Sequence, residues 1–161
     1  MKKKNLIKLL LFLFIVMVLS ITFSINSMAK AKEEGKVKWL KYNEGLAKAK
    51  KEDKPIFIDF YTDWCHYCKL MEQQTFSDSK VSKLIKESFI AIRVNADKEK
   101  DVTSKYRITG YPNVWFLKSN GEPIGVLPGF VKADVFLNIL EYIRGRYYEK
   151  MNFKQYMEKK K

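Results

Sequence analysis

Cysteine and histidine are almost absent from this chain of 161 residues, which has two cysteines and one histidine. A structural zinc site usually takes four ligands from two such pairs, so His66 lying between Cys65 and Cys68 does not predict a metal centre. Attachment of c-type haem needs histidine directly after the second cysteine, where this chain has Lys69. A structural disulfide would close a loop too small to remove much entropy from the unfolded chain. Because zinc binding, haem attachment and a structural disulfide are all disfavoured, we interpret the cysteine pair as a redox site.

Acidic residues are also scarce, because 31 lysines and arginines stand against 18 aspartates and glutamates, a net charge of +13. Residues 1–29 carry four lysines and no acid, which leaves 27 basic and 18 acidic residues, net +9, after them. Such an excess is typical of proteins that bind nucleic acid or a membrane surface. The lysines are scattered, however, so we interpret them as a solvated basic surface, with no nucleic-acid partner. Surface binding through a basic C-terminal tail, residues 149–161, is the alternative.

The N-terminal residues 1–29 have the pattern of a secretory signal peptide. Lys2–Lys4 form a positive start, residues 9–25 are almost wholly apolar, and Ser27 and Ala29 are small residues at the positions that a signal peptidase reads. The apolar run approaches spanning length, so an uncleaved membrane tether through residues 6–27 is the alternative. Residues 30–36 read as a charged linker. Both interpretations predict a periplasmic or other extracytoplasmic location for the rest of the chain.

One stretch, Asp59–Lys69, holds both cysteines and the histidine. An apolar run, residues 55–61, leads into it, and a predicted helix beginning near Cys68 leads out. The first sulfur then lies at a helix N-terminus, where unpaired backbone N–H groups and the helix dipole favour negative charge. Such a position lowers the pKa of a thiol from about 8.5. The spacing therefore predicts that Cys65 is a nucleophile that attacks disulfides.

The residues around this pair resemble the active-site segment of the thioredoxin superfamily. The resemblance consists of Asp59 in the preceding strand, Trp64 directly before Cys65, and Tyr111–Pro112 downstream. It covers residues 37–148 and implies an α/β thioredoxin fold, with a central mixed β-sheet flanked by helices on both faces. Residues 43–55, which run directly into the central strand, are similar to the C-terminal domain of the transmembrane disulfide reductase of the Dsb system. The extracytoplasmic branch of the superfamily is therefore indicated.

Hydrophobic periodicity and turn residues predict the order of the elements. Strands are expected over residues 37–40, 56–61, 89–95, 113–117 and 124–127, with helices over residues 44–50, 68–76, 81–86, 97–106 and 134–148. The strands at 37–40 and 89–95 are expected to flank the central strand in parallel. Asn43 is expected to cap the first helix and Asp78 a later one, and residues 119–122 to form a hairpin turn.

The resemblance implies roles for three residues of the reaction. Cys65 would be exposed and would attack, and the buried Cys68 would resolve the mixed disulfide. Asp59 would help to deprotonate Cys68. An unpaired charge inside an apolar strand is costly, so a raised pKa is expected for Asp59. The alternative is that Asp59 reaches solvent at the strand end.

Five further residues are expected to surround or tune the pair. His66 would favour the Cys65 thiolate, unless it is an exposed histidine with little effect. The resemblance places Tyr111–Pro112 in a cis-proline loop that binds a substrate strand, with an ordinary trans turn as the alternative. Trp64 and Tyr67 would form an apolar rim for substrates, and core packing is the alternative for Trp64.

The sequence thus predicts an extracytoplasmic thiol–disulfide oxidoreductase that acts mainly as a reductant of protein disulfides. It requires no organic cofactor and no metal. Its expected partners are protein substrates with disulfides or thiols and a membrane or soluble redox partner protein. A thiol oxidant, a disulfide isomerase or a non-catalytic binding module with the same fold are the alternatives.

Overall fold

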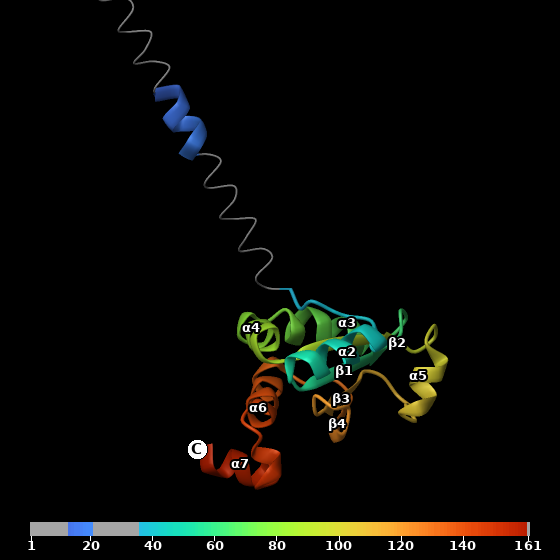
Figure 1. Cartoon of the computed structure of the whole chain (residues 1–161). Helices are drawn as coiled ribbons and strands as arrows, with labels where there is room; N and C mark the ends of the chain where they lie inside the picture. The colour runs from blue at the N-terminus through green and yellow to red at the C-terminus, as the bar shows by residue number, and fades with distance from the viewer. Residues whose placement is uncertain (1–12, 21–35, 161) are drawn as a thin grey trace, which may run out of the picture. The chain divides into compact units, whose positions relative to one another are not determined.

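A computed structural model of the chain describes residues 13–20 and 36–160. The chain divides into two compact units, Met1–Glu34 and Gly35–Lys161 (Figure 1). Residues 13–20 are helical, and their seven large apolar side chains are 42–62% exposed. Within the described ranges, no helix is long and apolar enough to cross a membrane. Most of the predicted signal segment and of the predicted linker lies outside the described residues.

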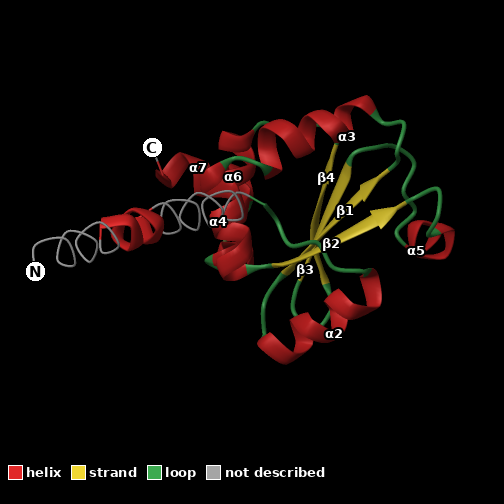
Figure 2. Ribbon diagram, turned by 90° about the horizontal axis from the view of Figure 1, so that it is seen from above, coloured by secondary structure: helices red, strands yellow, loops and turns green. Residues whose placement is uncertain are grey.

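The second unit is built on a mixed four-stranded sheet (Figure 2). Its strands are β1 (Ile56–Tyr61), β2 (Ile90–Asn95), β3 (Asn113–Leu117) and β4 (Pro123–Pro128), in the order β2-β1-β3-β4. β1 pairs with β2 in parallel and with β3 antiparallel, and β3 pairs with β4 antiparallel. The central strand and the hairpin therefore lie where the sequence predicts them.

The strand predicted over residues 37–40 is wrong. Only Leu40 pairs, through one parallel bridge to Ile92 on the outer edge of β2. The Leu40 N–H donates to the Ala91 carbonyl at 2.9 Å, and the Arg93 N–H donates to the Leu40 carbonyl at 3.1 Å. The segment also lies beside β2 rather than beside the central strand. The pairing ends there because the chain enters a helix at Tyr42.

Helices cover both faces of this sheet, as predicted (Figure 2). The helices and helical turns of this unit are α2 (Tyr42–Glu52), α3 (His66–Met71), the π-helical turn η1 (Glu72–Phe76), α4 (Ser79–Ser88), α5 (Lys100–Lys105), α6 (Ala133–Arg144), the 3₁₀ turn η2 (Tyr147–Glu149) and α7 (Phe153–Lys160). Asp78 caps α4 as predicted, because its carboxylate accepts the N–H groups of Lys80 and Val81. The prediction that Asn43 caps the first helix is wrong, because α2 already begins at Tyr42. Tyr42 is buried, and its hydroxyl is hydrogen-bonded to the hydroxyl of Tyr106.

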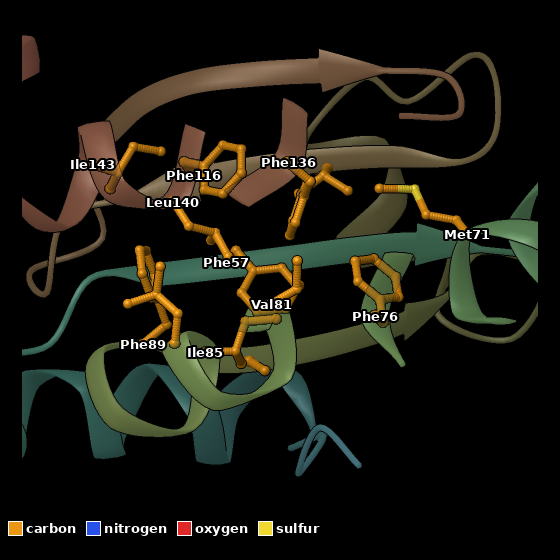
Figure 3. Close-up of a cluster of buried hydrophobic side chains, with 13 residues drawn as sticks. Phe57, Met71, Phe76, Val81, Ile85, Phe89, Phe116, Phe136, Leu140 and Ile143 are labelled. Carbon is orange, nitrogen blue, oxygen red and sulfur yellow. The ribbon is translucent and has the colours of Figure 1, made fainter. Parts of the chain in front are cut away.

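The core has one cluster on each face of the sheet. Ile56, Ile58 and Phe60 of β1 pack with residues of α2, and Phe57 packs on the opposite face with α4 and α6 (Figure 3). The ring centroids of Phe57 and Phe136 are 6.1 Å apart. This alternation is the one that the sequence predicts for a strand covered on both faces. It holds β1 rigidly up to Tyr61, where the segment with the cysteines begins.

The predicted basic tail contains a folded helix. Asn152 and Gln155 cap α7 reciprocally, each backbone N–H donating to the other's side chain at 2.9–3.0 Å. The Tyr142 ring of α6 lies 5.5 Å from the Phe153 ring and 5.4 Å from the Tyr156 ring. The helix α7 is therefore fastened to α6 by aromatic contacts.

Candidate active site

Both cysteines lie at the junction between β1 and α3. β1 ends at Tyr61, and Cys65 is the N-cap residue of α3. The two cysteines form a disulfide, and the Cys68 backbone N–H donates to Cys65 Sγ at 3.0 Å. A hydrogen bond to sulfur from the first turn of a helix stabilises negative charge on that sulfur. The junction therefore presents Cys65 as the cysteine whose anion is favoured.

The expected exposure of Cys65 is wrong for this disulfide-bonded state. Cys65 is 5% exposed and Cys68 2% exposed. Each sulfur covers the other through the disulfide, and the Cys68 N–H lies against Cys65 Sγ. The residues beside the pair are exposed instead.

Exposed aromatic and imidazole side chains surround the pair. Trp64 is 69% exposed, which rules out core packing for this residue, and His66 and Tyr67 are exposed as well. The Tyr111 ring meets the Trp64 ring edge-on with centroids 6.1 Å apart. Trp64, Tyr67 and Tyr111 thus bring aromatic surface to the site from two separate segments.

The Tyr111–Pro112 peptide bond is cis. Pro112 is buried and Tyr111 is half-buried. The Pro112 carbonyl accepts the N–H of Gly129 at 2.8 Å. The loop before β3 therefore contacts Trp64 through the Tyr111 ring and is hydrogen-bonded to the loop after β4 through Pro112.

Asp59 is a buried carboxylate in the strand that leads to the cysteines. It is 1% exposed, so it does not reach solvent at the strand end. Burial, the largest effect, raises its pKa to about 6, although the Arg93 guanidinium acts in the opposite direction. Arg93 Nε donates to Asp59 Oδ2 at 3.1 Å, while Oδ1 has no hydrogen-bond partner among the described residues. A carboxyl with this pKa exchanges its proton near neutral pH.

Arg93 connects this buried carboxylate to the surface. The Arg93 Nη2 group donates to Glu72 Oε2 at 3.1 Å. The Arg93 guanidinium also lies over two aromatic rings, 4.2 Å from the Tyr61 ring centroid and 5.2 Å from the Trp39 ring centroid. The sequence reasoning missed this role. An available signal was the single charged residue inside the apolar run of β2, because parallel pairing places Arg93 directly beside Asp59.

The loop that contains Trp64 is held by the loop after β2. The Trp64 indole N–H donates to Asp97 Oδ2 at 3.0 Å. Asp63 forms an ion pair with Lys98 and accepts the side-chain amide of Asn95, both at 3.1 Å. The sequence reasoning missed these contacts, since nothing local links the two loops. In the part of the chain that the structure describes, no group of three His, Cys, Asp or Glu residues could hold a metal ion.

Comparison with known proteins gives consistent matches to this fold. A family model for a thioredoxin-like domain matches residues 42–144. Thioredoxin of Borreliella burgdorferi is 30% identical over 115 residues, which cover 71% of this chain and 95% of that protein. The thiol:disulfide interchange protein DsbD of Neisseria meningitidis is 37% identical over 95 residues, 57% of this chain but only 16% of that protein.

Two solved structures have the same fold. The reduced C-terminal domain of Neisseria meningitidis DsbD is 36% identical with a TM-score of 0.52, over 62% of this chain and 90% of that one. A thioredoxin from Thermus thermophilus is 29% identical with a TM-score of 0.62, over 66% of this chain and 86% of that one. These matches confirm the thioredoxin fold predicted from the sequence.

Proposed function

Because this chain belongs to the thioredoxin-like family and is a thiol–disulfide oxidoreductase, we propose that it reduces disulfide bonds of proteins outside the cytoplasm. The observation that carries the proposal is the Cys65–Cys68 disulfide at a strand–helix junction, six residues after a buried aspartate with a pKa of about 6. The similarity to the C-terminal domain of DsbD, a thiol:disulfide interchange protein, supports thiol–disulfide exchange as the reaction. The exposed apolar helix at residues 13–20 supports export.

The reaction begins with the reduced pair. The Cys65 thiolate attacks one sulfur of a substrate disulfide, a Cys65–substrate bond forms, and the other substrate sulfur leaves as a thiolate. The helix start and the Cys68 N–H, 3.0 Å from Cys65 Sγ, stabilise the attacking anion. The exposed rings of Trp64 and Tyr67 provide apolar surface for the substrate chain.

Resolution requires the second thiol to lose its proton. Asp59 accepts the proton of Cys68, directly or through one water, because a base with a pKa near the working pH is efficient. The Cys68 thiolate then attacks Cys65 Sγ, so that the Cys65–Cys68 disulfide forms and the second substrate thiolate leaves. The substrate gains two electrons and the protein loses two. A membrane or soluble redox partner protein has to return them.

Insulin reduction with dithiothreitol as the electron source tests the activity. We expect the wild type to accelerate the reduction and Cys65→Ser to show only the uncatalysed rate. Equilibration with glutathione tests the direction. A potential near that of thioredoxin, about −270 mV, supports a reductant, whereas one near that of the strong periplasmic oxidants, about −120 mV, contradicts it.

One observation favours an oxidant as the second candidate. His66 is exposed between the cysteines at the first position of α3. When protonated it favours the Cys65 thiolate, which stabilises the reduced form and makes the disulfide more oxidising. His66→Ala should then lower the potential, and an unchanged potential would remove this candidate's support.

The location is tested separately on the full-length chain. Cleavage after Ala29 would give a mature N-terminus at Lys30, which mass spectrometry of the exported protein detects. An intact chain recovered in the membrane fraction supports the tether through residues 6–27. Recovery of the intact chain from the cytoplasm would contradict export.

A further inference from the structure

The helix that carries Cys68 changes its winding before it ends. α3 continues directly into the π-helical turn η1 at Glu72–Phe76, where the Ser77 N–H donates to the Glu72 carbonyl, five residues back, at 3.2 Å. Single π-turns inside α-helices are frequently found at functional sites. Here the turn brings Thr75 into the interior, where it is 0% exposed.

The hydroxyl of Thr75 has a specific partner far away in the sequence. Its Oγ1 donates to the backbone carbonyl of Val131 at 2.6 Å, across 56 residues. Val131 lies in the loop that joins β4 to α6. Since a buried hydroxyl needs a hydrogen-bond partner, this contact fixes the loop against the helix of the resolving cysteine.

The loop after β4 is also hydrogen-bonded to the Tyr111–Pro112 segment beside the disulfide. The Gly129 N–H donates to the Pro112 carbonyl at 2.8 Å, and the neighbouring Tyr111 ring meets the Trp64 ring at 6.1 Å. Trp64 is covalently joined to Cys65. The contacts therefore form a closed ring that starts at Cys68, passes through Thr75 and the loop at residues 129–131, and returns to Cys65.

We infer that Thr75 is a positioning residue that sets how a protein substrate is held at the disulfide. This inference rests on the proposed function. Thr75 does not touch the sulfurs itself. It acts through Val131, which holds the loop at residues 129–131, and thereby Pro112, in a fixed place relative to the cysteines. A protein substrate must lay its backbone beside the pair and depends on that placement, whereas a small disulfide does not.

The test compares Thr75→Val, which has nearly the same shape without the hydroxyl, with Thr75→Ser, which keeps the hydroxyl. For insulin we expect Thr75→Val to raise KM about fivefold with little change in kcat, the effect of one lost neutral hydrogen bond. The rate of reaction of the reduced protein with dithiobis(nitrobenzoate), a small aromatic disulfide, should stay at the wild-type value. Thr75→Ser should restore the insulin KM.

A second measurement does not depend on activity. Amide hydrogen exchange at Gly129 should be faster in Thr75→Val than in the wild type and in Thr75→Ser, because the ring of contacts is opened. Thr75→Ala serves the same purpose if Thr75→Val does not fold.

The inference is overturned if the insulin KM of Thr75→Val stays within twofold of the wild type. An equal loss with both disulfides would also overturn it, since Thr75 would then act on the thiol chemistry or on folding alone. These outcomes are distinct from failure of the proposed function, in which the wild type itself would not accelerate insulin reduction.

Discussion

Replacing Arg93 with methionine should slow the resolution step at neutral pH and spare it at alkaline pH. Arg93→Met keeps a long side chain against the rings of Tyr61 and Trp39 and removes the cation that lies 3.1 Å from Asp59 Oδ2. Asp59 then remains buried with no opposing charge. Its pKa should rise, because burial is already the largest effect on it and Arg93 is the group that opposes burial.

The size of the effect follows from the fraction of Asp59 that is ionised. With a pKa of about 6, roughly nine tenths of Asp59 is ionised at pH 7. Unpaired buried carboxylates reach pKa values of about 8–9. At a pKa of about 8, only roughly a tenth would be ionised at pH 7, so the resolution rate should fall about tenfold.

Stopped-flow reaction of the reduced protein with a disulfide substrate between pH 6 and pH 9.5 measures this effect. The attack step is measured alone in a Cys68→Ala background, with and without Arg93→Met. We expect the acidic limb of the resolution profile, along which the rate rises with pH, to move up by about two pH units, since the raised pKa of Asp59 sets it. Arg93→Lys, which keeps the charge, should move it much less. Superimposable profiles, or a loss that is equal at every pH, would refute the role of Arg93 in ionising Asp59.

Three further outcomes follow from the same contacts. Asp59→Asn should raise the free energy of unfolding by about 3 kcal/mol at pH 7, because a folded-state pKa of about 6 lies about two units above the unfolded value. The gain should appear as pH rises from about 4 to about 6, and urea titrations without that pH dependence would contradict it. Cys68→Ala should accumulate mixed disulfides with protein substrates on non-reducing gels, and an additional Cys65→Ser change should abolish them. Tyr142→Ala should lose about 1–3 kcal/mol of stability with insulin reduction retained, whereas Tyr142→Phe should lose only about 1 kcal/mol, since it removes the bond to the Met151 carbonyl alone.

The features that local patterns encode were predicted well. The alternation of apolar residues places β1 at Ile56–Tyr61. The helix expected from Cys68 is present, although it begins two residues earlier, at His66. The hairpin turn contains Gly121, whose φ of 90° suits glycine better than any other residue. The burial of Asp59 was predictable as well, since every neighbour in its strand is apolar or aromatic. Each of these depends on residues close together in the chain.

Sequence patterns alone were therefore enough to indicate the redox pair, the strand and helix that carry it, and the buried acid. The partners of those residues were decided only by the packing of the whole domain. Asp59 meets Arg93 across 34 residues, Trp64 meets Asp97 across 33, and Thr75 meets Val131 across 56. Such contacts depend on which strands pair, in which register, and on the paths that the loops take over a filled core. The same packing limited the first predicted strand to a single bridge at Leu40, because α2 begins two residues later.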